Sequence, residues 1–228
     1  MSKKKGLARL QAIFRMLAPH VQGVVVDVGC DHGQLTGMIQ DLIRTEGRHA
    51  TVIGIERRGH RLPSKRSASG YPMQLMVADG MRGLRHVDAC VIAGMGPHNI
   101  LEILAAGPRP KTAVVHSPDR TDTLRRGLKK AGWRIVEESL APENNRCAEL
   151  LRIEPGVEYS TGHTLLFGPR LLEVGDPLLT QHLAWVRRHW STVALSAPAG
   201  SHGHTRATEW VDFIDGLQLP EPVLPASP

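Results

Sequence analysis

The chain has 228 residues, of which 41% are hydrophobic, and this suits one sizeable packed domain with a small appendage. No apolar run approaches the roughly 18 residues that cross a membrane, and the basic start lacks the apolar core of a signal peptide. The net charge of +6 favours a polyanionic partner, whereas an aromatic content of 4% argues against a stacking platform for single strands.

The first 131 residues alternate between helical and strand patterns. Apolar residues at helical spacing predict a helix over 7–17 that ends before Pro19. Apolar runs rich in β-branched residues predict five buried strands, at 24–29, 51–55, 73–78, 89–93 and 112–116. Helical spacing predicts helices after the first, fourth and fifth of these strands, at 35–43, 98–106 and 121–131. This alternation predicts an α/β fold with a parallel, doubly wound sheet.

Two more strand-like segments, 133–140 and 147–153, follow this alternation. The polar link between them, 141–146, is too short for a crossover helix, so we expect an antiparallel hairpin. Five parallel strands followed by an antiparallel hairpin are the layout of Rossmann-like class I methyltransferases. We therefore expect residues 1–156 to form one Rossmann-like domain.

The character of the chain changes after about residue 156. Residues 165–169 read as a turn, and helical spacing recurs at 178–195 and 205–217 around a flexible link. These features predict a C-terminal helical hairpin within a small domain over 157–219. The Pro-rich end, 220–228, is expected to be a disordered tail.

The strongest local motif is DVGCDHG at residues 27–33, where the first strand turns into a helix. Glycine allows a ligand to approach the backbone there, and the helix start offers free N–H groups. The motif is not G-x-G-x-x-G, and taken alone it also fits a tight turn.

Three further motifs follow the next three strands. Glu56 ends the second strand, where a carboxylate can accept hydrogen bonds from both ribose hydroxyls of a nucleoside. Asp79 and Gly80 end the third strand, where a carboxylate can accept from the amine of adenine. A glycine-containing loop, 93–96, ends the fourth strand. Each motif also fits a solvated charge or an ordinary turn, but together they predict an adenosine-containing ligand in one crevice.

The segments VDVGCDH (26–32), IAGMG (92–96) and LFGP (166–169) resemble the TrmK family of bacterial tRNA adenine-22 N1-methyltransferases. The resemblance runs from about residue 7 to residue 190. It implies a Rossmann-like catalytic domain, a helical, coiled-coil-like C-terminal domain, S-adenosylmethionine (SAM) as cofactor and tRNA as partner. The predicted cofactor-binding residues are Asp27, Gly29, Asp31, His32, Gly33, Glu56, Asp79, Gly80, Ala93, Gly94, Met95 and Gly96.

The chain departs from the family pattern in three loops. Pro97 replaces a second glycine, and the segments 57–60 and 116–119 differ from those usual in the family. Methylation of another RNA base, and a SAM- or RNA-binding protein without catalysis, therefore stay open as alternatives. A nicotinamide oxidoreductase is disfavoured because G-x-G-x-x-G is missing.

The predicted chemistry is methyl transfer from a sulfonium to adenine N1. This nitrogen has a free lone pair, so positioning and electrostatics suffice and no general base is required. Asp31 is the candidate catalytic residue, placing negative charge near the base, although support of the turn explains it equally well.

Basic clusters predict contacts with tRNA phosphates, although solvated faces are the alternative explanation. The predicted nucleic-acid-binding residues are Arg57, Arg58, Arg61, Lys65, Arg66, Arg125 and Arg126. His202 and His204 lack a third ligand nearby, so no metal is expected. Three widely spaced cysteines fit neither a metal site nor a disulfide framework and favour a reducing cytoplasm.

Overall fold

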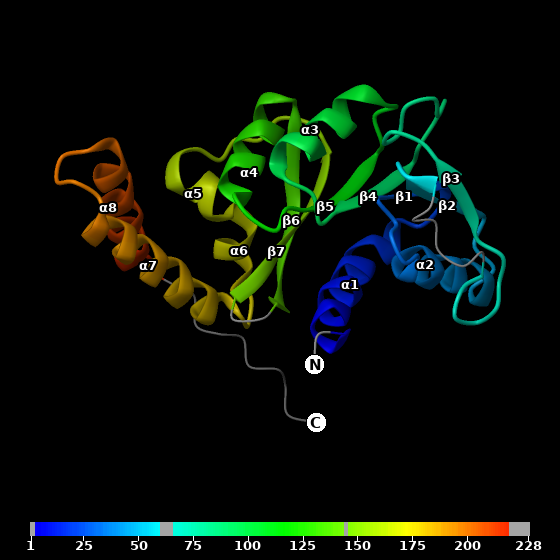
Figure 1. Cartoon of the computed structure of the whole chain (residues 1–228), viewed down its shortest axis with the longest axis horizontal. Coiled ribbons are helices and arrows are strands. Elements are labelled where there is room, and N and C mark those ends of the chain that lie inside the picture. The colour runs from blue at the N-terminus through cyan, green and yellow to red at the C-terminus, as the bar shows by residue number, and fades with distance from the viewer. Residues whose placement is uncertain (1–2, 60–65, 144–145, 219–228) are drawn as a thin grey trace.

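A seven-stranded sheet runs through the middle of the molecule (Figure 1). The computed structural model describes residues 3–59, 66–143 and 146–218. The strand order is β3-β2-β1-β4-β5-β7-β6. The strands are β1 (Gly23–Val28), β2 (Ala50–Glu56), β3 (Gln74–Val77), β4 (Ala89–Ala93), β5 (Thr112–His116), β6 (Trp133–Glu143) and β7 (Arg146–Pro155).

Strands β1 to β5 are parallel, and β7 pairs antiparallel with both β5 and β6. The predicted fold class, a Rossmann-like methyltransferase sheet that ends in an antiparallel hairpin, is confirmed. The predicted link 141–146 was too long, because Ala141 pairs with Ala148 and Glu143 pairs with Arg146 in the strand ladder. Backbone pairing continues through polar residues that a hydrophobic pattern does not mark as strand.

Helices cover both faces of the sheet, α3 and α4 on one face and α1 and α2 on the other (Figure 1). Val26 and Ile92 pack towards Ile100 of α3, whereas their neighbours Val25 and Val91 face the opposite core. Successive strand residues point to opposite faces, so a sheet buried on both sides needs the continuous apolar runs seen in the sequence. The covering helices are α1 (Lys3–Leu17), α2 (Gln34–Thr45), α3 (Pro97–Ala106) and α4 (Thr121–Lys130), and a short 3₁₀ turn, η1 (Ala18–His20), follows α1.

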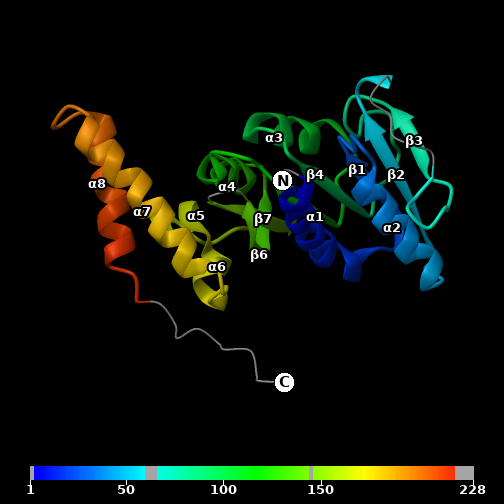
Figure 2. The same ribbon diagram turned by 60° about the horizontal axis from the view of Figure 1, so that its bottom comes forward.

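Four helices follow the sheet, and the last two form an antiparallel pair that extends away from it (Figure 2). The predicted helical hairpin is confirmed. The segment 165–169, predicted as a turn, instead holds the junction of two short helices at Gly168, whose φ is +138°. The helices are α5 (Gly162–Phe167), α6 (Pro169–Val174), α7 (Leu179–Ser196) and α8 (His202–Asp215).

The C-terminal helices share a third core with the β6–β7 hairpin. Leu140 of β6 and Cys147 of β7 pack with Phe167, Leu183 and Trp210. The edge of β6 is covered as well, because the buried Glu158 accepts a hydrogen bond from the N–H of Ile135 at 2.9 Å and Asp176 accepts one from Leu140 at 3.0 Å. Covering an edge strand removes a template for unwanted strand pairing.

The cysteines, the helix lengths and the C-terminal end complete the description of the fold. All three cysteines are free and buried. Within the described residues, no helix combines the length and the apolar character that a membrane span requires. The predicted tail, 220–228, lies outside the described residues.

Candidate active site

Two adjoining cavities lie at the carboxyl ends of β1, β2, β3 and β4. The cavity beside α3 measures about 280 Å³ and the cavity beside α1 about 710 Å³; we call them the α3 cavity and the α1 cavity. Gly29, Glu56 and Met95 line both of them. In open α/β sheets, ligands bind in the crevice at this edge, and small-molecule sites span roughly 300–1,000 Å³.

The glycine turn after β1 separates the two cavities. Gly29 has φ +74°, and its N–H and that of Cys30 both donate to the carbonyl of Ile55, at 2.8 and 3.0 Å. A Cβ on Gly29 would lie 2.5 Å from Cε of Met95. The missing side chain therefore leaves room for the side chain of Met95, and the backbone conformation is one that glycine adopts without cost.

Asp27 sits at the end of β1 and lines the α1 cavity. Its carboxylate is buried and accepts a hydrogen bond from Oγ1 of Thr36 at 2.6 Å. Burial raises the pKa of Asp27 to about 6, and the bond from Thr36 opposes that shift. A buried carboxylate beside a cavity attracts a cationic group there, because a nearby positive charge favours its ionised form.

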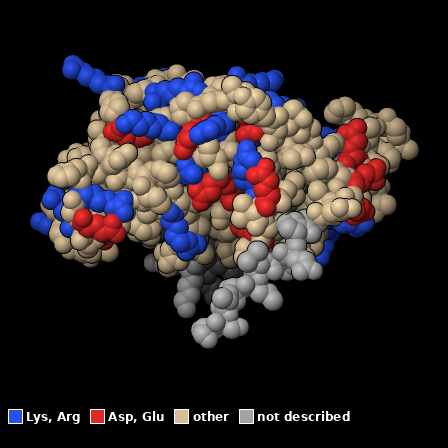
Figure 3. Space-filling model, turned by 180° about the vertical axis from the view of Figure 1, so that it is seen from behind, with Lys and Arg blue, Asp and Glu red and all other residues tan. Residues whose placement is uncertain are grey.

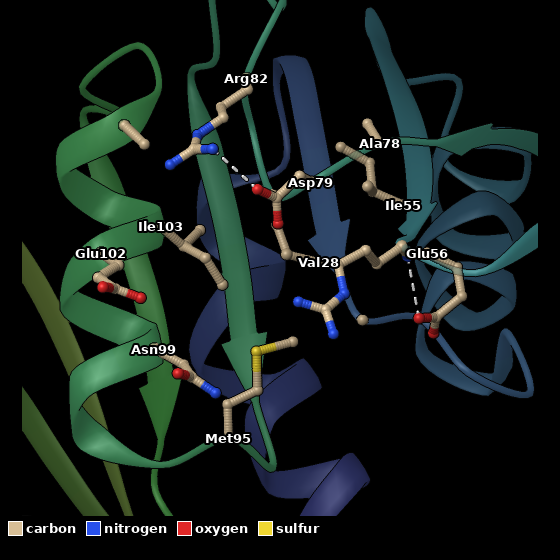
Figure 4. A pocket seen from close by; sticks show the side chains of 14 residues that line it. Val28, Ile55, Glu56, Ala78, Asp79, Arg82, Met95, Asn99, Glu102 and Ile103 are labelled. Atoms are coloured by element: carbon tan, nitrogen blue, oxygen red, sulfur yellow. Dashed lines mark hydrogen bonds and ion pairs between the residues drawn. The ribbon is translucent and has the colours of Figure 1, made fainter.

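Glu56 ends β2, and its carboxylate links this strand end to the turn that follows β1. Its carboxylate accepts hydrogen bonds from the backbone N–H of Arg57 at 3.0 Å and from that of Asp31 at 3.4 Å. Figure 4 shows Glu56 at one side of the α3 cavity and Asp79 across from it. Oδ2 of Asp79 accepts from Arg82 at 2.9 Å. Two carboxylates thus border the α3 cavity from neighbouring strands.

The loop after β4 forms the wall between the cavities. The N–H of Gly94 donates to the carbonyl of His116 at 3.0 Å, which ties the loop to the end of β5. The side chain of Met95 extends into the crevice (Figure 4). Burial lowers the pKa of His116 to about 4, so this imidazole is neutral at physiological pH.

The structure places most of the predicted cofactor residues together, with two exceptions. Asp27, Asp31, His32, Ala93 and Gly94 line the α1 cavity beside the three residues that line both. Asp79 and Gly80 line the α3 cavity. Gly33 and Gly96 line neither, since they are the N-cap residues of α2 and α3.

Asp31 and His32 project from the turn into an open part of the α1 cavity. Both side chains are largely exposed, and Nε2 of His32 lies 3.6 Å from Oδ2 of Asp31. Asp31 has φ +44°, a region that residues other than glycine rarely adopt. Such local strain occurs often at ligand sites, which makes this turn a place to look for function.

The predicted nucleic-acid contacts fall into different environments. Arg57 lines the α3 cavity, and Arg58 is exposed just beyond β2. Arg66 is exposed and donates to the carbonyl of Gly70 at 2.7 Å. Arg126 is exposed on α4. Arg61 and Lys65 lie outside the described residues.

The prediction that Arg125 contacts phosphate is wrong. Its side chain is 1% exposed, and its Nε donates to Oε1 of Glu138 at 2.7 Å while its Nη1 lies 2.7 Å from Oε2 of Glu149. Nη1 also donates to the carbonyl of Leu166 at 2.9 Å. Arg125 therefore joins α4 to the β6–β7 hairpin and to α5, and it is not available to a polyanion.

Several lining residues were missed by the sequence analysis. Asn99, Glu102 and Ile103 of α3 border the α3 cavity, and Arg9 and Leu10 of α1 border the α1 cavity. The three α3 residues follow the glycine loop closely, so their place in the helix was a usable signal. The α1 residues precede the first motif, and nothing in the sequence indicated that they would line a cavity. Arg9 also forms an ion pair with Glu143, which holds α1 against the end of β6.

Fold and site together define the class of this protein. The strand order, the terminal antiparallel hairpin and the two-part crevice are those of a class I SAM-dependent methyltransferase. Residues 7–151 match the family described as "Methyltransferase domain", and the chain belongs to that family. The predicted class of enzyme is thereby confirmed.

The similar proteins cover between 74% and 91% of the chain. The Mycoplasma genitalium protein MG248, provisionally named a tRNA methyltransferase, is 25% identical over 177 residues, which are 74% of this chain and 79% of that protein. The structure of Sp1610 from Streptococcus pneumoniae, provisionally described as a tRNA (m1A22) methyltransferase, superposes with a TM-score of 0.75 at 23% identity, covering 91% of this chain and 96% of that one. That of the B. subtilis m1A22 tRNA methyltransferase TrmK superposes with a TM-score of 0.68 at 20% identity, with the same coverage. Sp1610 has also been crystallised with SAM.

Proposed function

We propose that this protein transfers the methyl group of SAM to N1 of an adenine in tRNA, at position 22. The observation that carries the proposal is the pair of cavities that meet at Gly29 and Met95, one bordered by carboxylates suited to adenosine and one open to a second substrate. The names of its structural relatives support tRNA as that second substrate.

The residues of the crevice fit SAM in charge and in shape. Glu56 can accept from ribose hydroxyls, and Asp79 lines the same cavity while its Oδ2 is held by Arg82. The buried Asp27 suits the ammonium of the methionyl end, and the two cavities share Gly29, Glu56 and Met95 as lining residues, so one ligand can occupy both. When bound, SAM supplies an electrophilic methyl group on a sulfonium.

The α1 cavity is the proposed place for the acceptor base. It is the larger of the two, and Asp31 is exposed at its border. Methylation leaves a positive charge on the adenine, and a carboxylate nearby stabilises that charge as it develops. Adenine N1 needs no deprotonation before it attacks, so Asp31 can contribute by its field alone.

Access to adenine N1 requires an unpaired base. N1 lies on the Watson–Crick edge, so pairing hides it, and extrusion from a stack costs roughly a few kcal/mol. The enzyme therefore acts at a weakly paired site such as the D-arm. The exposed Arg58, Arg66 and Arg126 are proposed phosphate contacts. On the face shown in Figure 3, basic and acidic side chains are interspersed.

The test is methylation of two tRNA transcripts that differ only at position 22, adenine in one and guanine in the other. We expect N1-methyladenosine in the first transcript alone, mapped to position 22 by mass spectrometry. Methyl groups at other adenines, on guanine or on ribose would replace this proposal with the methylation of another RNA position. SAM binding without any methylated product in total tRNA would point to a binding protein without catalysis.

A further inference from the structure

A third cavity, which we call the aromatic cleft, lies between the start of α4 and the α7–α8 hairpin. It measures about 280 Å³ and shares no lining residue with the α1 or α3 cavity. Helix α4 begins five residues after the end of β5, so the cleft lies at the same carboxyl edge of the sheet as the proposed active site. Its lining includes Arg120, Thr121, His182, Trp185, Trp190 and Arg206.

The walls of the cleft hold a concentration of aromatic rings. The chain has four tryptophans, and three of them, Trp185, Trp190 and Trp210, line this one cavity. Trp185 stacks on His189 with ring centroids 5.8 Å apart, and Trp190 stacks on Trp210 at 5.7 Å. Trp185 and Trp190 remain half-buried, so each ring is partly exposed towards the cavity. Flat, partly exposed aromatic rings are the surfaces on which nucleobases stack.

Arginine side chains line the cleft, and among the described residues one of them, Arg120, forms no ion pair. The guanidinium of Arg206 lies 5.1 Å from the ring centroid of Trp190 and pairs with Asp122 at 2.6 Å. Arg120 is exposed at the N-cap of α4, and the first turn of that helix, starting at Thr121, also lines the cavity. Helix N-termini and arginines both favour anions such as phosphate.

A buried polar group lies at the base of the cleft. His182 of α7 is 2% exposed, and within the part of the chain that the structure describes its Nδ1 has no hydrogen-bond partner. Its Nε2 lies 3.8 Å from Oε1 of Glu149. Buried polar atoms are nearly always satisfied, so an unpartnered one that lines a cavity indicates a missing ligand or water. A neutral imidazole offers one donor and one acceptor, which suits the edge of a base.

We propose that the aromatic cleft binds one unpaired nucleotide of the RNA substrate, with its base stacked on Trp185 or Trp190, its edge at His182 and its phosphate at Arg120. This inference rests on the proposed function, since it takes tRNA as the substrate. The cavity is slightly below the roughly 300–1,000 Å³ of small-molecule sites, so it suits a single base and not an RNA helix. A base held here, at the same edge of the sheet as the proposed acceptor site, would fix how the tRNA lies along that edge.

The experiment measures the affinity of fluorescently labelled tRNA for the full chain and four variants at one fixed salt concentration. Trp185→Ala removes the stacking ring, and Trp185→Phe keeps a ring while removing the indole. Arg120→Glu reverses the charge at the start of α4, and Tyr159→Ala removes an aromatic ring that is 85% exposed outside the cleft. SAM affinity, measured by calorimetry for every variant, reports whether the protein is folded and its cofactor site intact.

We expect Trp185→Ala and Arg120→Glu to weaken tRNA binding, the first by about fivefold to a hundredfold, as for the loss of one stacked base. Trp185→Phe and Tyr159→Ala should bind as the unaltered protein does. Binding of tRNA should also quench tryptophan emission, and Trp185→Phe should lose part of that quenching while keeping its affinity.

Two results would overturn the inference, and only the second would also overturn the proposed function. Equal tRNA affinity of Trp185→Ala and Tyr159→Ala would remove the cleft from RNA binding and leave the proposed function standing. An unaltered protein that binds SAM but no tRNA would remove the proposed substrate, and the nucleotide in the cleft with it.

Discussion

The cofactor crevice and the aromatic cleft lie at the same edge of one sheet but are built in different ways. The crevice is shaped by backbone: glycine turns at strand ends, and N–H groups of Gly29 and Cys30 that share one carbonyl. The cleft is shaped by side chains from α4, β7, α5, α7 and α8, which span residues 121 to 215 of the sequence. A site built from backbone leaves a short motif in the sequence, and a site built from packed side chains does not.

The two regions also differ in how charge is held. In the crevice the carboxylates of Glu56 and Asp79 are partly exposed and can turn towards a ligand. Beneath the cleft, Arg125 is buried between Glu138 and Glu149, and Glu138 also accepts a hydrogen bond from the N–H of Arg170 at 2.9 Å. Desolvation makes such a buried network costly to form and more costly to break. The carboxylates of the crevice are therefore accessible to a ligand, whereas the buried network beneath the cleft holds the C-terminal helices in place.

The largest expected effect is the loss of this buried network. Arg125→Met should destabilise the protein by about 3–5 kcal/mol, because Glu138 and Glu149 would be left buried without their partner. Arg126→Met, on the exposed neighbouring position of α4, should change stability by no more than about 0.5 kcal/mol. Urea denaturation of both variants makes the comparison, and similar midpoints would mean that the network contributes nothing.

The crevice holds one group whose burial opposes stability at neutral pH. The pKa of Asp27 is raised from 3.8 to about 6. The contribution of this group to the free energy of unfolding is therefore fully present below pH 4 and is lost as the pH rises through 6. Asp27→Asn mimics the protonated form and can still accept the bond from Thr36. At pH 7 it should therefore be more stable than the unaltered protein by up to about 3 kcal/mol, with the difference vanishing near pH 4.

Denaturation at several pH values between 4 and 7 measures this effect, and SAM affinity at pH 7 provides the second readout. If Asp27 attracts the cationic end of SAM, the stabilised variant should bind it more weakly. A stability difference that does not change with pH would show that Asp27 is not the titrating group.

The contrast between the two regions explains what could be predicted from the sequence. The strands and the glycine turn were predictable because a sheet buried on both faces needs apolar runs, and because sharp strand-to-helix turns need glycine. The role of Arg125 was missed although its signal was present: Thr121, Leu124, Arg125 and Leu128 occupy one helix face and are all buried. The carboxylates that neutralise it come from the hairpin, and only the folded chain brings them there.

Composition alone could not show where the few aromatic residues lie. An aromatic content of 4% argued against stacking on bases, but an average over the chain does not register position. Trp185, Trp190 and Trp210 meet across the α7–α8 hairpin because the two helices fold back on each other. Three tryptophans can therefore line one cavity although the aromatic content of the whole chain is low.

A smaller effect is expected in the crevice, at the ribose position. Glu56→Ala should weaken SAM binding by about 1–3 kcal/mol, the cost of losing hydrogen bonds to a charged acceptor. Glu46→Ala serves as the control, because Glu46 is exposed beyond α2, at the opposite edge of the sheet, and pairs only with Arg48 among the described residues. Calorimetry that finds the same SAM affinity for both variants would remove Glu56 from the cofactor site.

The smallest expected effect concerns single phosphate contacts outside both cavities. Arg58 is exposed just beyond β2 at the carboxyl edge, and Arg44 is exposed at the end of α2 near the opposite edge. Arg58→Ala and Arg44→Ala each remove one positive charge, so they change the net charge of +6 equally.

Binding of tRNA releases counterions from the phosphates that the protein neutralises, and each contact contributes about 0.7–0.9 to the slope of log affinity against log salt. We expect Arg58→Ala to flatten the slope by about one such contact and Arg44→Ala to leave it unaltered. Equal slopes for the two variants would mean that Arg58 acts only through net charge, which would leave the aromatic cleft, Arg66 and Arg126 as the places to look for the RNA path.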